Sequence, residues 1–253
     1  VGGPARALVE PGSAEDVKSV VEFCKSEQIP YYIVGNGSNL LVSDQGYEGV
    51  IIQIYKQMNR VEITENEIHA QAGALLSMIA NRAMEAELTG FEFAAGIPGT
   101  LGGACVMNAG AYGGEMKDVL EMVTVLTRDG DVKTLTKDEL ELGYRTSVIA
   151  KKDYIVLSAV IRLENGRKEE IKAVMDDLKE KRITKQPLEY PSAGSTFKRP
   201  EGYFAGKLIQ DAGLRGFQVG GAQVSEKHCG FVVNKDQATA ADVMNLMNQV
   251  SDK

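Results

Sequence analysis

The hydrophobic positions of this chain follow two periods, one typical of helices and one typical of strands. Ser13 and, three residues later, Asp16 predict the start of a helix with its buried stripe at Val17, Val20, Val21 and Cys24. A second helix is predicted over residues 74–87. Short apolar runs predict strands over residues 31–34 and 50–54.

The second half of the chain also mixes strands and helices. Alternating apolar residues over 123–135 flank Asp129-Gly130 and predict a hairpin with a two-residue turn. A strand over 154–163 precedes a charged amphipathic helix over 168–182 with apolar positions Ile171, Val174, Met175 and Leu178. The last predicted elements are a short helix over 205–212 that stops at Gly213, strands over 217–219 and 231–233, and a final helix capped by Thr239. This mixture predicts an α+β fold.

A polar, glycine-rich loop, GNGSN at residues 35–39, follows the first predicted strand. A Rossmann dinucleotide site needs a helix of roughly ten residues directly after such a loop and an acidic residue about twenty positions later. Here Asp44, Gly46 and Gly49 break any helix, and another strand is predicted from residue 50. The loop is therefore either a phosphate-holding loop outside a Rossmann fold or an ordinary turn.

A second glycine-rich stretch occupies residues 94–114. It contains seven glycines and no charged side chain, together with the apolar residues Ile97, Leu101, Val106 and Met107. That composition is unlike a flexible linker, so we expect a folded, buried loop. Residues without a Cβ let backbone N–H groups converge on phosphate oxygens; the alternative is a crowded helix–sheet contact that needs small residues. Two such loops favour a large ligand with a pyrophosphate.

Composition and charge narrow the class of protein. The 253 residues are 43% hydrophobic, which is enough for a packed core. The net charge is -7 and no basic stripe is present, which makes nucleic acid an unsuitable partner. Cys24, Cys105 and Cys229 are widely spaced, which excludes a disulfide framework and a zinc site, and no metal is expected. The absence of an apolar span or signal segment predicts a cytoplasmic protein without membrane insertion.

Five stretches follow one another along the chain: GNGSNLLVSDQGYEGVII, AAGIPGTLGGACVMNAGAYGGEM, GYRTS, PSAGSTFKRP and GGAQVSEKHCGFVVN. Together they resemble the motifs of the UDP-N-acetylenolpyruvoylglucosamine reductase family, the MurB flavoenzymes of peptidoglycan synthesis. The first two motifs also belong to the wider flavoprotein superfamily that includes vanillyl-alcohol oxidase, whereas the last three are particular to the reductases. The chain lacks the long insertion with a substrate-clamping Tyr, so it resembles the shorter, second type.

This resemblance implies a fold with two functional parts. A two-part FAD-binding domain of the vanillyl-alcohol oxidase (PCMH) type is expected, followed by a smaller α+β substrate-binding domain. The expected ranges are 1–55 and 56–165 for the two FAD-binding subdomains, and 166–253 for the UDP-sugar-binding domain, truncated at its C-terminal end.

The resemblance also implies the reaction. NADPH reduces non-covalently bound FAD at N5, and the enolpyruvyl group of UDP-N-acetylglucosamine-enolpyruvate then takes the hydride at C3 and a proton at C2. The product is UDP-N-acetylmuramate. Because the flavin supplies the hydride chemistry, the protein must position it, stabilise charge and provide a proton.

The cofactor-binding residues implied by the resemblance lie in the two glycine-rich stretches. The first set is Gly35, Asn36, Gly37, Ser38, Asn39 and Leu40. The second set is Gly96, Ile97, Pro98, Gly99, Thr100, Gly102, Gly103 and Asn108.

The catalytic residues implied by the resemblance are Ser195, as the proton donor, and Arg145, which faces the substrate carboxylate. A serine hydroxyl is a weak acid, so it can act only toward a strongly basic carbanion or enol that is shielded from solvent. A fixed guanidinium stabilises the enolate-like transition state more than the ground state. Substrate contacts are expected from Tyr144, Lys185, Arg199 and Gln223.

Both ends of the chain suggest a longer parent protein. The chain begins at Val1 without Met, and the helix capped by Thr239 runs to Lys253 without a stop signal. The family ends with a strand carrying a glutamate that assists protonation, and that residue would lie beyond Lys253. We therefore expect this chain to bind FAD with impaired turnover.

Two other functions remain open at this point. One is an FAD-dependent oxidase of the same superfamily that acts on a small alcohol or lactone, and the other is a non-catalytic UDP-sugar or flavin-binding module. A covalent flavin is not expected, although Cys105 lies within the second glycine-rich stretch. The expected partners are NADPH and the enolpyruvyl nucleotide, and we expect a monomer.

Overall fold

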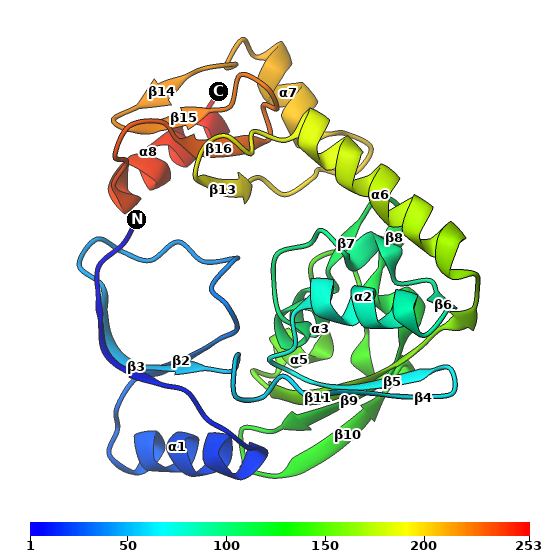
Figure 1. Ribbon diagram of the computed structural model, residues 1–253. Coiled ribbons are helices and arrows are strands. Elements are labelled where there is room, and N and C mark those ends of the chain that lie inside the picture. Colours follow the sequence, from blue (N-terminus) through cyan, green and yellow to red (C-terminus); the bar gives the residue numbers. More distant parts are fainter. The chain divides into compact units, whose positions relative to one another are not determined.

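The computed structural model describes all 253 residues, which form two compact units (Figure 1). The larger unit comprises Arg6–Ser38 and Glu48–Lys179, and the smaller unit comprises Val1–Ala5, Asn39–Tyr47 and Glu180–Lys253. The domain ranges 1–55, 56–165 and 166–253 stay a prediction. The two compact units divide the chain at other positions, because the smaller unit contains Asn39–Tyr47 together with the C-terminal residues.

A three-stranded sheet and one helix form the N-terminal part of the larger unit. The sheet has the order β1 (Ala5–Val9), β3 (Tyr47–Gln53), β2 (Tyr31–Val34), and α1 (Ala14–Ser26) begins at the predicted cap, Ser13, whose Oγ accepts from the Asp16 N–H at 3.1 Å. β2 and β3 are parallel, and no helix lies in the connection between them. The exclusion of a Rossmann unit is therefore confirmed.

The second part of the larger unit is an antiparallel sheet of five strands. Its order is β10 (Val132–Thr136), β9 (Leu120–Leu126), β11 (Ile155–Arg162), β5 (Glu67–Gln71), β4 (Val61–Thr64). The predicted β9–β10 hairpin is confirmed, but the two-residue turn is wrong. Residues 127–131 form a longer loop, in which Thr127 N–H donates to the Asp131 carbonyl at 2.8 Å and Gly130 takes a φ of +88°.

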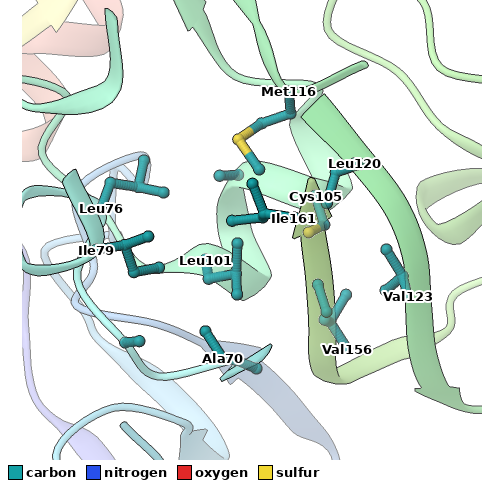
Figure 2. Packing of buried hydrophobic residues seen from close by; sticks show 14 of the residues in the cluster. Ala70, Leu76, Ile79, Leu101, Cys105, Met116, Leu120, Val123, Val156 and Ile161 are labelled. Atoms are coloured by element: carbon teal, nitrogen blue, oxygen red, sulfur yellow. The ribbon is translucent and has the colours of Figure 1, made fainter. Parts of the chain in front are cut away.

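Helices cover one face of this sheet and bury the main core. They are α2 (Leu76–Glu85), α3 (Leu101–Met107) and α5 (Val148–Lys151). Leu76 and Ile79 of α2 and Leu101 of α3 lie in one cluster with Ile161 of β11, all essentially inaccessible to solvent (Figure 2). Burial of one such side chain contributes about 2 kcal/mol, so the cluster as a whole contributes substantially to stability.

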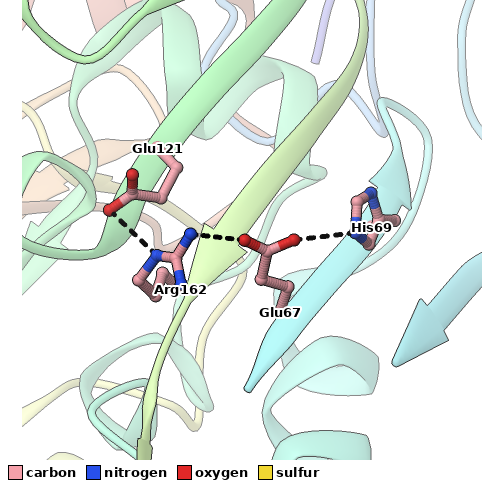
Figure 3. Close-up of polar contacts among 4 residues, drawn as sticks. All are labelled: Glu67, His69, Glu121 and Arg162. Carbon is pink, nitrogen blue, oxygen red and sulfur yellow. Dashed lines mark hydrogen bonds and ion pairs between the residues drawn. The ribbon is translucent and has the colours of Figure 1, made fainter. Parts of the chain in front are cut away.

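Charged side chains occupy strand positions away from that core. Arg162 of β11 lies between Glu67 of β5 and Glu121 of β9, with its Nε 3.5 Å from the Glu121 carboxylate (Figure 3). His69 Nε2 lies 3.2 Å from the other oxygen of Glu67. These pairs are exposed and contribute little energy each, but they keep this part of the sheet polar.

One prediction for the glycine-rich stretch 94–114 is wrong. Instead of a continuous loop, residues Leu101–Met107 form α3. Two glycines disfavour a helix by about 1 kcal/mol each, but tertiary contacts outweigh this cost. Gly102 lies so close to Ala72, the residue after β5, that an added Cβ would come within 3.1 Å of the Ala72 Cβ, so the small residues are needed for close packing.

Short elements complete the larger unit, and one long helix leaves it. The short pairs are β6 (Leu88–Thr89) with β12 (Glu164–Asn165) and β7 (Gly110–Ala111) with β8 (Gly114–Glu115); the short helices are η1 (Glu92–Ala94), α4 (Met116–Val119) and η2 (Asp138–Leu140). The predicted charged helix is confirmed as α6 (Lys168–Lys185). Its apolar stripe is only partly buried, because Ile171 is buried whereas Val174 is 47% exposed.

The smaller unit is an antiparallel four-stranded sheet with two helices. The strand order is β13 (Ser192–Ser195), β16 (Phe231–Asn234), β15 (Ala222–Val224), β14 (Gln218–Val219). The helices are α7 (Ala205–Asp211), followed by Gly213 at a φ of +72°, and α8 (Ala240–Ser251), which starts at the predicted cap Thr239. Alternate residues Ala222, Val224 and Val232 pack against Val243 and Leu246 of α8.

The segment Asn39–Tyr47 belongs to the smaller unit although it follows the first glycine loop. Its residue Leu41 packs against the core of this unit. Ser43 accepts a hydrogen bond from Gly3 N–H at 2.7 Å, and a Cβ at Gly46 would overlap the backbone of Pro4. Residues 3 and 4 therefore contact the segment Asn39–Tyr47.

Candidate functional site

The two glycine-rich stretches meet inside the larger unit. Ser38 Oγ donates to the Pro98 carbonyl at 2.8 Å. A Cβ on Gly35 would overlap Thr100 Oγ1, and the Gln53 side chain donates from Nε2 to the Gly35 carbonyl at 3.1 Å. The absence of a side chain at residue 35 therefore permits the first loop to approach the second directly.

Backbone donors remain unpaired in the first loop. The N–H groups of Asn36, Gly37 and Ser38 donate to no acceptor in the structure, and Gly37 has a φ of +75°. Successive N–H groups in such a turn form a concave donor set that suits a phosphate. No cationic cluster is needed, because the backbone dipoles supply the positive potential.

The second stretch supplies fewer donors than its glycine content suggests. Leu101 N–H donates to the Ala74 carbonyl and Gly102 N–H to the Ala72 carbonyl, both at 2.8 Å. These two bonds fasten the start of α3 to the segment after β5. The loop before α3, with Gly99 at a φ of +152°, is the part that faces Ser38.

Asn108 is a structural junction. It is buried at the end of α3 in the left-handed region, with a φ of +43°. Its Nδ2 donates to Glu115 Oε2 at 2.8 Å and to the Gly143 carbonyl at 3.1 Å, and its Oδ1 accepts from Lys117 N–H at 2.9 Å. The side-chain amide hydrogens are thus both engaged within the protein, and they connect the second stretch to the GYRTS motif.

Arg145 occupies the tip of a tight turn. Gly143 and Thr146 exchange backbone hydrogen bonds of 3.1 and 3.2 Å, leaving Tyr144 and Arg145 as the two turn residues. Arg145 has a φ of +55°, a conformation uncommon for a residue with a side chain. Such local strain persists only where surrounding contacts hold it in place.

The contacts that hold this turn come from α3. Besides the Asn108–Gly143 bond, the buried Ser147 donates from Oγ to the Val106 carbonyl at 2.7 Å and caps α5. Tyr144 is 58% exposed, and the Arg145 guanidinium lies 5.8 Å from its ring centre. The predicted cofactor segment and the turn of the predicted carboxylate-binding arginine are therefore joined by two hydrogen bonds within the larger unit.

In the smaller unit, Ser195 follows an irregularity in β13. Ser192 pairs with Val233 and Ser195 with Phe231, so β13 contains one residue more than β16 over this interval. Gly194, at a φ of +74°, absorbs the bulge. A bulge turns the following side chain, and the exposed Ser195 hydroxyl makes no hydrogen bond to the protein.

The other predicted substrate residues of the smaller unit are dispersed over its surface. Lys185 is the exposed last residue of α6, and Arg199 follows β13. Gln223 is buried and donates from Nε2 to Gln218 Oε1 at 3.2 Å. It lines an open pocket of about 340 Å³ together with Glu189, Tyr190, Ser225, Lys227 and Lys235. Since neighbouring strand residues point to opposite faces, this pocket lies on the face away from α8.

The cysteines are free and buried. Burial raises the pKa of the Cys105 thiol to about 12, so it carries no thiolate at neutral pH. No group of three or more His, Cys, Asp or Glu side chains is placed to hold a metal ion. None of the helices combines the length and the apolar character that crossing a membrane requires.

Two family models match the chain. Residues 5–136 match an FAD-binding domain, and residues 186–253 match the C-terminal domain of UDP-N-acetylenolpyruvoylglucosamine reductase. The reductase of Agathobacter rectalis is 56% identical to this chain, over the whole chain and 84% of the relative. This chain belongs to the UDP-N-acetylenolpyruvoylglucosamine reductase family. The reductase of Clostridioides difficile is 55% identical over 98% of this chain and 81% of its own length.

A solved structure agrees with this membership. The UDP-N-acetylenolpyruvylglucosamine reductase (MurB) of Thermus caldophilus superimposes with a TM-score of 0.86 at 37% identity, covering 100% of this chain and 90% of that one. The predicted fold, an FAD-binding domain followed by a smaller α+β domain, is confirmed for this member of the reductase family.

Two residues outside the predicted site residues also hold the site in place. Gln53 holds the first loop through Gly35, and Ser147 holds the arginine turn through Val106. Ser147 lies inside the GYRTS motif, so its place in the motif indicates a role beside Arg145. Gln53 lies at the end of an apolar strand, and nothing in its sequence context indicates a role in this reductase.

Proposed function

We propose that this chain is an NADPH-dependent, FAD-containing reductase that converts UDP-N-acetylglucosamine-enolpyruvate to UDP-N-acetylmuramate for peptidoglycan synthesis. Its membership in the reductase family supports the activity. The observation that carries it in this chain is that the two glycine-rich stretches meet through Ser38 and Pro98. The second stretch is also bonded, through Asn108, to the turn that carries Arg145.

The residues present fit a pyrophosphate cofactor. The unpaired N–H groups of residues 36–38 are donors for phosphate oxygens, and the bare Cα of Gly35 keeps the loop against Thr100. The bound FAD, held without a covalent bond, would supply the hydride chemistry between NADPH and the enolpyruvyl group. Asn39 and Leu40 follow in the sequence, and we assign them to cofactor binding as well.

Arg145 would bind the carboxylate of the enolpyruvyl group. When a hydride adds to the double bond, negative charge moves toward that carboxylate, and a guanidinium already in place stabilises it without reorganisation. The hydrogen bonds of the turn hold the backbone of Arg145 in place. Removal of one such stabilising group costs about 3 kcal/mol in the barrier.

Ser195 would donate the proton that completes the addition. Its hydroxyl has no acceptor within the protein, so its hydrogen is available to a basic carbon on the substrate. We further assign Tyr144, Lys185, Arg199 and Gln223 to substrate binding. A monomeric state is part of the proposal. So is a cytoplasmic location, because the substrate and NADPH are both soluble metabolites.

Anaerobic half-reactions test this function. Addition of NADPH should bleach the flavin absorbance at about 450 nm, and the enolpyruvyl nucleotide should restore it. Wild-type protein that bleaches but never recovers with this nucleotide would disprove the proposed substrate. Ser195→Ala should bleach normally and recover about 100-fold or more slowly. Ser26→Ala, in α1, is the matched control and should behave as wild type; equal losses in both half-reactions of Ser195→Ala would refute the role of proton donor.

A further inference from the structure

Gln53, the last residue of β3, contacts the first peptide of the GNGSN loop. Its half-buried side chain donates from Nε2 to the Gly35 carbonyl at 3.1 Å. The contact follows from the strand register, because Gln53 lies opposite Val34 in the parallel pair β2–β3 and Gly35 is the residue after β2. An uncharged amide is thus placed where the chain leaves the sheet and the loop begins.

This hydrogen bond fixes the orientation of one peptide group. The Gly35 carbonyl and the Asn36 N–H belong to the same peptide, and no peptide bond in the chain is cis. A planar trans peptide directs its C=O and its N–H to opposite sides. Because the carbonyl is turned toward Gln53, the Asn36 N–H is turned away from it and joins the N–H groups of residues 37 and 38, which have no acceptor within the protein.

The sequence makes this peptide easy to reverse. Residue 35 has to be glycine, since a Cβ there would overlap Thr100 Oγ1, and glycine moves between backbone conformations with little steric hindrance. A reversed peptide would offer a carbonyl oxygen to the ligand in place of the Asn36 N–H. Converging N–H groups attract an anion, whereas a carbonyl oxygen repels it. The loop therefore needs a contact that selects one of the two orientations.

We propose that Gln53 is a positioning residue for flavin binding: by holding the Gly35 carbonyl, it keeps the Asn36 N–H available to a phosphate oxygen of FAD. Gln53 acts through the backbone and has no contact of its own with the cofactor in this proposal. The inference deepens the proposed function, because it rests on the assignment of residues 36–38 to the pyrophosphate.

Gln53→Met tests this role, because methionine has nearly the same length and no hydrogen-bond donor. Isothermal titration of the apoprotein with FAD should give a Kd about tenfold higher than that of wild type, since one N–H no longer faces the phosphate in every molecule. In a crystal structure of the variant apoprotein, the peptide between residues 35 and 36 should occupy both orientations. A single orientation identical to that of wild type would overturn the proposal.

Gln71→Met is the matched control. Gln71 is also the last residue of a strand, β5, and its Oε1 accepts from the Arg60 N–H at 2.9 Å, so each variant loses one bond between a side chain and the backbone. The two apoproteins should therefore be destabilised to a similar extent in thermal melts. Only Gln53→Met should bind FAD more weakly.

A third variant restores the donor without adding a permanent charge. At pH 8 the imidazole of Gln53→His is neutral and donates from one ring nitrogen, so the Kd for FAD should return to within about threefold of wild type. A His variant that binds FAD no better than Gln53→Met would show that the donated hydrogen bond is not the cause.

The remaining outcomes separate this inference from the proposed function. Equal Kd values for wild type, Gln53→Met and Gln71→Met would overturn the positioning role, and so would an equal loss of affinity in both variants. Neither result would affect the proposed reaction. That reaction fails instead if the wild-type holoenzyme, once reduced by NADPH, is not reoxidised by the enolpyruvyl nucleotide.

Discussion

Asp44 caps helix α8 at a sequence separation of 196 residues: its Oδ1 accepts from Ala240 N–H at 2.7 Å. The second oxygen accepts from the Ala241 N–H at 2.9 Å. The carboxylate thus pairs two of the donors that the first turn of a helix leaves unsatisfied, and its charge complements the helix dipole. The segment after the first glycine loop is thereby tied to the C-terminal helix.

Replacement of this carboxylate should weaken the smaller unit. Asp44→Ala should lower the free energy of unfolding by about 1 kcal/mol, because both N–H groups lose their acceptor. Asp44→Asn keeps one side-chain oxygen and should lose less. Urea unfolding followed by circular dichroism measures the difference. Gln45→Ala, at an exposed neighbour, is the control and should match wild type; an Asp44→Ala midpoint equal to that of the control would contradict the capping role.

Asp242 should make the same helix sensitive to acid. Hydrogen bonds from the backbone N–H of Thr239 and of Gly221 lower the pKa of this carboxyl below its ordinary value of 3.8. Because the folded-state pKa is lowered, the carboxylate stabilises the fold fully above its ordinary pKa of 3.8. This stabilisation is lost as the pH falls through the folded-state pKa.

The comparison of wild type with Asp242→Asn measures this linkage. The stability difference should be largest near neutral pH and should shrink below pH 3.8. Thermal melts at a series of pH values give the curve. A difference that grows on acidification would show that the sign of the linkage is wrong.

Gly35 should be essential for flavin binding. Gly35→Ala introduces a Cβ that overlaps Thr100 Oγ1, which forces the two glycine stretches apart. The purified variant should therefore carry much less flavin, seen as a lower ratio of visible to ultraviolet absorbance. Gly12→Ala is a matched control, because its Cβ would meet only Asp16 Oδ2 at 3.4 Å. Full flavin content in Gly35→Ala would mean that the contact with Thr100 is dispensable.

Arg145 should act on the second half-reaction alone. Arg145→Lys keeps the charge but loses the planar, two-pronged donor geometry, so flavin reoxidation by the enolpyruvyl nucleotide should slow about 100-fold. The rate of bleaching by NADPH should stay at the wild-type value. Stopped-flow absorbance measures both. Arg128→Lys, on the hairpin loop, serves as the control, and an equal effect of the Arg145 change on both steps would exclude the assigned role.

Cys105 should be inert. The thiol is fully buried and its pKa is raised to about 12, so it has neither exposure nor thiolate character for attack on a flavin or a reagent. Acid precipitation of the holoenzyme should leave all the yellow colour in the supernatant. A coloured pellet, together with a mass increase on the peptide that contains Cys105, would demonstrate a covalent flavin instead.

Local signals in the sequence predicted local structure well. The caps Ser13 and Thr239 each bond a backbone N–H three residues later, so a short window contains the whole interaction. Helix α3 was missed because its stability comes from contacts with residues such as Ala72 and Ala74, which no short window includes. The Asp129-Gly130 signal predicts a two-residue turn, whereas the loop is longer because Thr127 and Asp131 pair across it.

The components of the site were predictable only as separate motifs. The resemblance to the family implies roles for Gly35, Thr100 and Arg145. The sequence does not show that Gly35 lies against Thr100, or that Asn108 is bonded to the turn that carries Arg145. The cap by Asp44 was equally inaccessible, because its partner lies at the far end of the chain. Long-range pairing of this kind depends on the complete fold.

The fastening of the GYRTS turn to α3 has a consequence for redesign. Tyr144 and Arg145 form the exposed tip, whereas Asn108 and Ser147 form the buried attachments. Changes at the tip should alter which acid is accepted while the protein keeps its yellow colour. Changes at the attachments would disturb both properties together, so directed evolution toward new substrates should begin at positions 144 and 145.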